Sequence, residues 1–230
     1  MSFQPLRRNP VRYRFALPNQ IWTWKLKPPA FAVLAYLCWL HGHSDDNSAH
    51  APGSLAMRLH MSPAMAAACL DDLIRRGLIT QDFAPTFPHD GKGTGCFFTL
   101  PYEIFYLDLG HGAIAVYAYL LCCESRRTHQ CHPSYSTISG ATGLAVNTVM
   151  KHINKLVDRQ LIAVERTSYI DNKGMKWNSN NCYTILPIRA AVEAFHRKQL
   201  EKLEEAVEQE QITGFLAEQV WPAKAPCAPS

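Results

Sequence analysis

The sequence predicts a mainly α-helical protein in which two similar domains follow one another, each with a small β-hairpin. The first observation is an internal repeat: a shift of 83 positions aligns residues 30–37 with 113–120, with six identities in eight positions. The second is that apolar residues in each copy recur at helical spacing before a β-prone stretch. A chain of 230 residues is long enough for two small domains.

The repeat keeps one register over most of its length and sets the expected domain boundaries. Leu17-Pro18 aligns with Leu100-Pro101, and Leu78-Ile79 aligns with Leu161-Ile162, without a gap. We therefore expect four segments: a basic N-terminal arm at 1–16, a first domain at 17–100, a second domain at 101–188, and a C-terminal helix with a disordered tail at 189–230.

The second copy has the clearer pattern. Residues 113–123 predict a first helix, and Pro133 and Ser134 mark the start of a short second helix that ends at Gly143. A third helix follows, with a buried stripe at Val149, Ile153, Leu156 and Val157. The β-prone stretches 161–169 and 181–186 flank a turn signal at 171–174, which predicts a two-stranded hairpin after the helix pair.

This succession of residues resembles a known family. The run Pro133-Ser134-Tyr135-Ser136-Thr137-Ile138, followed by Thr142-Gly143-Leu144-Ala145-Val146-Asn147-Thr148-Val149, is similar to the winged helix-turn-helix of bacterial regulators and of phage and plasmid replication initiators. Residues 126–131 and 183–187 further resemble mobile-element proteins of Gram-positive bacteria that are called replication initiators. The resemblance implies two tandem winged-helix domains plus a C-terminal helix. It implies sequence-specific binding of double-stranded DNA, in replication or in transcriptional control of a mobile element.

The third helix of the second copy is the expected recognition helix, which enters the major groove. Its outward residues are predicted to be Asn147, Thr148, Lys151, His152 and Lys155. Asn147 can bond adenine in a bidentate way, Lys151 can reach guanine or a phosphate, and Thr148 can touch a thymine methyl group. Phosphate contacts are expected from Ser134, Ser136 and Thr137, and wing contacts from Arg166, Lys173, Lys176 and Asn178. For any single residue, a merely solvated polar position is about as well supported.

The first copy departs from this pattern on its third helix. That helix is expected to expose Ala64, Met65, Ala67 and Ala68, a surface that suits packing better than base readout. We therefore expect the first domain to contact another chain or the other domain. Backbone-only contact of this domain with DNA stays open as an alternative.

The charge distribution agrees with a polyanionic partner without proving one. The net charge is +4, and the segment 1–16 carries Arg7, Arg8, Arg12 and Arg14 with no acidic residue. The segment 101–188 has eight basic and six acidic residues, and the segment from 189 onward has five and seven. DNA is the expected partner, and a winged-helix module that binds only proteins is the alternative.

Other functional classes find little support in the sequence. Cys122, Cys123, His129, Cys131 and His132 lie close together in sequence, but their spacing matches no common zinc pattern, so no metal and no cofactor is expected. Phosphate-binding loops, nucleophile elbows and paired catalytic carboxylates are missing as motifs, so we expect no enzyme. Without a bilayer-length apolar run or a signal-peptide pattern, the expected location is the cytoplasm.

The C-terminal stretch, from Arg189 to about Leu216, is predicted to be helical. Leu200, Leu203 and Val207 recur at coiled-coil spacing, over too few heptads for a stable coiled coil by itself. This helix could dock on a domain or pair with a second subunit. A homodimer through the first domain or through this helix is therefore a further expectation.

Overall fold

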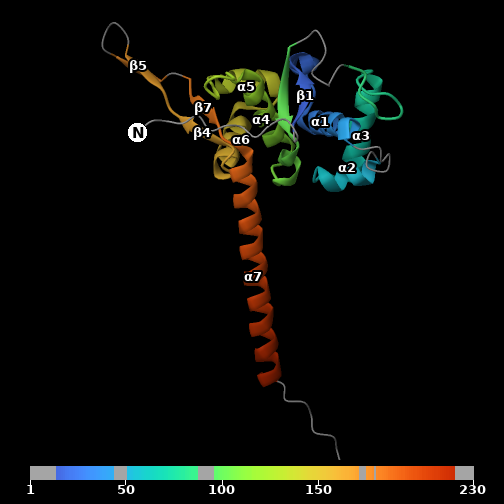
Figure 1. The fold of residues 1–230 in the computed structure, drawn as a ribbon, viewed down its shortest axis with the longest axis vertical. Helices are drawn as coiled ribbons and strands as arrows, with labels where there is room; N and C mark the ends of the chain where they lie inside the picture. Colours follow the sequence, from blue (N-terminus) through green and yellow to red (C-terminus); the bar gives the residue numbers. More distant parts are fainter. Residues whose placement is uncertain (1–13, 44–50, 88–95, 171–174, 179, 221–230) are drawn as a thin grey trace, which may run out of the picture. The chain divides into compact units, whose positions relative to one another are not determined.

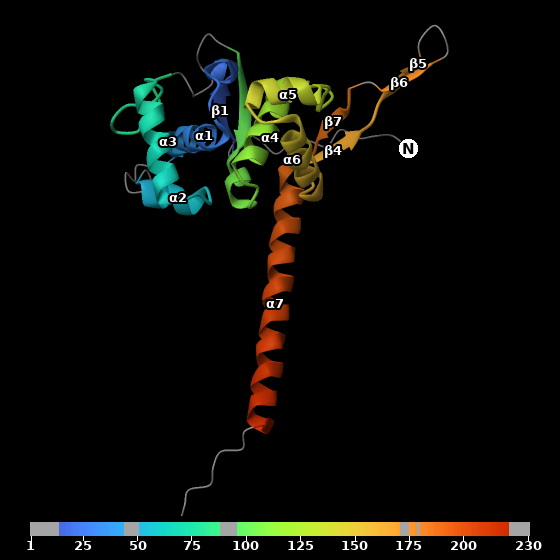
Figure 2. The ribbon, with the colours of Figure 1, turned by 180° about the vertical axis from the view of Figure 1, so that it is seen from behind.

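The computed structural model of the chain is mainly helical with small antiparallel sheets, which confirms the predicted fold class. It describes residues 14–43, 51–87, 96–170, 175–178 and 180–220. Figure 1 shows the ribbon in sequence colours, and Figure 2 shows it from behind. None of the described helices is both long and apolar enough to cross a lipid bilayer.

The first half begins with a strand and then builds a group of helices. Its elements are β1 (Arg14–Pro18), the 3₁₀ helix η1 (Asn19–Trp24), α1 (Pro28–His43), α2 (Pro52–Arg58) and α3 (Pro63–Arg75). β1 includes the last three residues of the expected N-terminal arm, of which Phe15 and Ala16 are buried. The rest of that arm lies outside the described residues.

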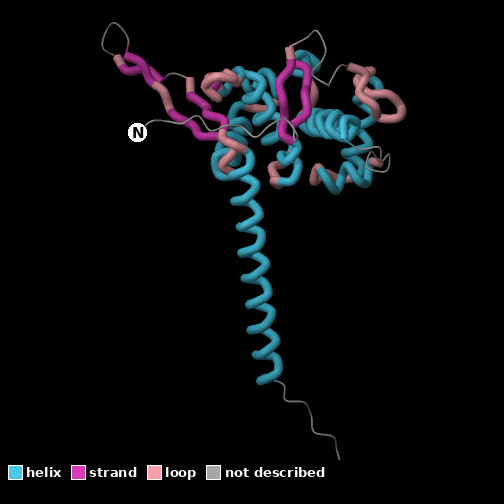
Figure 3. Tube along the Cα trace, in the orientation of Figure 1, coloured by secondary structure: helices cyan, strands magenta, loops and turns pink. Residues whose placement is uncertain are grey.

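The second half repeats this order and adds the wing. Its elements are β2 (Phe97–Pro101), η3 (Tyr102–Tyr106), α4 (His111–Cys123), β3 (Gln130–Cys131), α5 (Tyr135–Thr142), α6 (Val146–Asp158), β4 (Ile162–Glu165), β5 (Ser168–Ile170), β6 (Lys176–Asn178) and β7 (Cys182–Ile185). Strands β3, β7 and β4 form one antiparallel sheet. Figure 3 shows β5 and β6 continuing outward from it as a second hairpin.

The two halves have equivalent structures at the predicted offset of 83 residues. The helices α1, α2 and α3 begin 83 positions before α4, α5 and α6, and α3 and α6 also end in step. The left-handed backbone positions recur at the same offset, as Lys25 with Asp108, His60 with Gly143, and Gly77 with Gln160. Positive φ angles are uncommon outside glycine, so their recurrence shows that the turns themselves are repeated.

Strands β1 and β2 join the halves across a local twofold axis. They pair antiparallel with Ala16 opposite Thr99, two residues that are themselves 83 positions apart. Arg14 pairs with Pro101 and Pro18 pairs with Phe97. A shift of 83 positions converts Arg14 into Phe97 and Pro18 into Pro101, so the two pairings are equivalent. This self-complementary pattern is that of a twofold interface, here within one chain.

The helices α1 and α4 pack against each other beside this strand pair, and both are buried along most of their length. The contacts divide the chain into residues 1–191 as one compact unit and residues 192–230 as another. The predicted boundary near residue 100 therefore falls inside β2, where the halves meet. The 33-residue helix α7 (Ile188–Val220) begins at the end of the first unit, where Ala191 is buried, and forms the described part of the second.

Candidate nucleic-acid interface

The turn between α5 and α6 is fixed by local hydrogen bonds. The Ser134 hydroxyl caps α5 by accepting from the Thr137 backbone N–H at 3.0 Å. At the other end Gly143 takes a left-handed conformation with φ of 70°, as the sequence predicts. The Ser139 hydroxyl donates to the Leu144 carbonyl at 2.6 Å, which ties the last turn of α5 to the loop that enters α6.

Helix α6 buries one side and exposes another. Val149, Ile153 and Leu156 are buried, as predicted, but Val157 is 39% exposed, so the prediction was wrong for this residue. The opposite side carries Asn147 and Lys151, both exposed. Asn154 continues this row one turn further and is also exposed. Sequence reasoning missed Asn154, although its spacing from Asn147 and Lys151 places it on the same face. We call Asn147, Lys151 and Asn154 the polar row of α6.

The other predicted residues of α6 lie off this row. Thr148 and Lys155 are partly exposed along one flank. His152 departs from the expectation that it points outward. Its ring lies against Gly112 of α4, where a side chain on residue 112 would overlap it. Burial lowers the pKa of His152, and the nearby Lys155 acts in the same direction. The half-buried imidazole therefore packs against α4 and does not belong to the outward row.

The start of α5 provides hydroxyl groups beside α6. Ser136 and Thr137 are exposed, and Ser134 is partly exposed. Ser134 Oγ lies 2.7 Å from Thr137 Oγ1, so these two hydroxyls share one hydrogen bond in addition to the cap. A helix N-terminus with such hydroxyls suits a phosphate oxygen.

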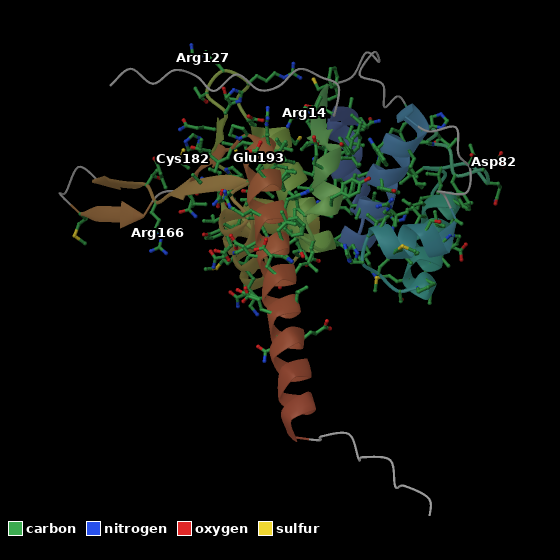
Figure 4. All side chains as sticks on the ribbon, turned by 60° about the horizontal axis from the view of Figure 1, so that its bottom comes forward. Arg14, Asp82, Arg127, Arg166, Cys182 and Glu193 are labelled. Carbon is green, nitrogen blue, oxygen red and sulfur yellow. The ribbon has the colours of Figure 1, made fainter. Side chains whose placement is uncertain are left out.

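The wing residues are described in part. Arg166 is exposed at the foot of the β5–β6 hairpin (Figure 4). Lys176 and Asn178 belong to β6, and Asn178 pairs with Ser168 of β5. Lys173 lies outside the described residues. The Thr167 hydroxyl donates to the Asn180 carbonyl, which closes the hairpin near Arg166.

Two of the cysteine and histidine residues around β3, Cys131 and His129, are engaged in packing and hydrogen bonding. Burial raises the pKa of Cys131 to about 12, which keeps its thiol protonated. His129 Nδ1 lies 2.8 Å from Glu124 Oε1. Among the residues that the structure describes, no group of three or more His, Cys, Asp or Glu side chains is arranged to hold a metal ion.

The equivalent face of α3 has different chemistry. Ala64, Met65 and Ala68 are exposed as predicted, with Met65 at 43%, whereas Ala67 is half-buried. Ala64 and Ala68 occupy the positions of Asn147 and Lys151, and Asp71 occupies that of Asn154.

Asp72, at the position of Lys155, accepts from Arg76 at 2.9 Å and from Arg75 at 3.2 Å. These two arginines are thus engaged by a carboxylate of their own helix. The face of α3 offers apolar and acidic groups where that of α6 offers amides and a cation.

Residues 107–162, which span α4 to the start of β4, match the family model described as a helix-turn-helix domain. Among curated proteins no relative matches the chain significantly. One similar solved structure is titled a possible transcriptional regulator from Methanosarcina mazei Go1, at 17% identity, with a TM-score of 0.33 over 48% of this chain and 89% of that one. The matched residues include α5, α6 and the tight turn between them.

Proposed function

We propose, from the helix-turn-helix domain at residues 107–162, that the second half of the chain binds double-stranded DNA in a sequence-specific way through α6. The observation that carries the proposal is the polar row of α6, in which Asn147, Lys151 and Asn154 are exposed together. The row lies on the second helix of a helix-turn-helix, the element that reads base edges in the major groove, and the capped start of α5 and the β-hairpin can supply backbone contacts.

Each part of this surface has a distinct role in the proposal. The amides of Asn147 and Asn154 read adenine edges, and Lys151 reaches guanine or a phosphate. Thr148 and Lys155 flank the groove, and Ser134, Ser136 and Thr137 place the start of α5 on a phosphate. His152 supports α6 from behind. Arg166, Lys173, Lys176 and Asn178 of the wing, with the arginines of the N-terminal arm, bind the neighbouring backbone.

The biological role that we propose is that of a cytoplasmic replication initiator or transcriptional regulator of a bacterial mobile element. It assigns the chain no catalytic step and no cofactor. The resemblance of residues 126–131 and 183–187 to such initiators supports this role. A genome-wide map of bound sites separates the two outcomes, because an initiator concentrates at a replication origin and a regulator at promoters.

The first test is the binding of a random-sequence duplex as a function of salt. Neutralised phosphates release counterions, so DNA binding weakens steeply as salt rises. A duplex selected from a random pool should then bind more tightly than the pool itself. If the chain binds no duplex even at low salt, the second candidate gains: a winged-helix module that binds only proteins.

That second candidate rests on the exposed Met65 and Ala68 of α3. An exposed apolar helix face favours contact with another chain, including a second copy of this one. Met65→Glu with Ala68→Glu should then lower the mass of the complex in solution while the second half stays folded. Unchanged mass together with unchanged DNA affinity contradicts an interface at this face.

A further inference from the structure

Helix α7 carries a row of large apolar side chains that face solvent. Leu200, Leu203 and Val207 are 60%, 62% and 52% exposed. Their spacing of three and four residues places them on one face of the helix. Exposed residues of this size occur singly on many proteins, but a continuous row on a helix is typical of a surface that binds another helix. We call these three residues the α7 seam.

The charges of α7 are divided along its length. Arg197, Lys198 and Lys202 precede the acidic stretch 203–210, which holds Glu204, Glu205, Glu208 and Glu210 and no basic residue. Glu201 with Glu205 and Glu204 with Glu208 are like-charge pairs one turn apart, which destabilise an isolated helix. The helix dipole also disfavours this order, in which basic residues lie nearer the N-terminus of the helix and acidic residues nearer its C-terminus. Within the helix Lys202 can pair with Glu205 three residues later, whereas Glu204, Glu208 and Glu210 have no basic residue three or four positions away.

We propose that α7 pairs with α7 of a second copy of this chain, in antiparallel orientation, through the α7 seam. In this orientation Leu200 of each copy meets Leu203 of the other, so the leucines form the centre of the interface and Val207 lies toward its edge. Arg197 and Glu204 lie seven residues apart on the same flank of the seam. Antiparallel pairing brings Arg197 close to Glu204 of the second copy. Because the pair is symmetric, this ion pair forms twice. A parallel pair would instead place the acidic stretches of the two copies side by side, and neither ion pair would form.

The pairing is independent of DNA and is tested without it. Analytical ultracentrifugation of the full chain should show a mass that rises with protein concentration toward that of a dimer. Leu200→Lys with Leu203→Lys should abolish this rise, because it places four ammonium groups in the seam of the pair. Glu205→Lys is the matched control: it changes net charge by the same amount on the opposite face and should keep the dimer. A monomer at every concentration, or a dimer that survives the lysine pair, overturns the proposal.

The orientation has its own test in a full-length background with Cys96, Cys123 and Cys227 changed to Ser. Positions 193 and 210, changed to cysteine in Glu193→Cys and Glu210→Cys, lie equally far along the helix from the midpoint between Leu200 and Leu203. A mixture of the two variants should form a disulfide between unlike chains. The Glu210→Cys variant alone should form no such disulfide. In an antiparallel pair the two cysteines at position 210 are separated by about 25 Å along the helices, at 1.5 Å per residue. Rapid crosslinking of Glu210→Cys with itself overturns the antiparallel arrangement.

Discussion

Trp22 of η1 stands edge-on to Tyr119 of α4, with ring centroids 5.1 Å apart and planes at 87°. The residues 83 positions away, Phe105 and Tyr36, make the same contact at 5.1 Å and 88°. Trp22 also stacks on Phe98 at 6.1 Å, as Phe105 stacks on Phe15 at 6.1 Å. Each half thus inserts an aromatic ring from its 3₁₀ helix against the first helix of the other half. The twofold axis between β1 and β2 extends through the core.

Because these contacts cross between the halves, residues 14–191 should unfold as one cooperative unit. Phe105→Ala removes a buried ring that contacts both halves and should destabilise the fold by about 3–5 kcal/mol. Denaturant unfolding followed by circular dichroism and by tryptophan fluorescence should give coincident transitions. Two separate transitions, with only one moved by the substitution, would show that the halves fold independently.

Gly112 should tolerate no larger residue while His152 lies against it. Gly112→Ala places a methyl group on the imidazole and should cost about 1–3 kcal/mol through overpacking. Adding His152→Ala should recover part of this loss, because it removes the overlapping ring. Equal destabilisation by Gly112→Ala in both backgrounds would mean that the two residues are not in contact.

The stability of the chain should fall in acid partly through His152. Its pKa is lowered by burial from the ordinary value of 6.5, so below that pH the unfolded chain binds a proton that the folded chain does not. The contribution is therefore complete above pH 6.5 and is lost as the pH falls toward the lowered pKa. His152→Gln should flatten the pH dependence of the unfolding free energy in this window. An unchanged slope contradicts the half-buried position of the ring.

Asn154 should contribute to DNA affinity, although its role is not evident from sequence alone. Asn154→Ala should weaken binding to a selected duplex by about 1–3 kcal/mol, with little effect on stability because the side chain is exposed. Asp71→Ala is the internal control, since Asp71 holds the equivalent position on α3. Equal effects of the two substitutions would argue against α6 as the reader.

The sequence predicted local structure well, because local signals determine it. Ser134 and Gly143 mark the two ends of α5, and the apolar stripe of Val149, Ile153 and Leu156 marks the inner side of α6. The direction of His152 could not be predicted, because it depends on the space that Gly112 leaves in a neighbouring helix. The twofold contact of the halves was equally hidden, since a repeat indicates that two segments fold alike and not how they pack together.

The central claim is that α6 reads DNA bases, and binding of Asn147→Ala to a selected and to a random duplex tests it most directly. The account predicts a loss of roughly 1–3 kcal/mol on the selected duplex and almost none on the random one. Lys173→Ala in the wing should weaken both alike and reduce the salt dependence, because a phosphate contact carries no sequence information. If Asn147→Ala binds both duplexes as the parent does, or weakens both equally, α6 does not read the sequence at this position.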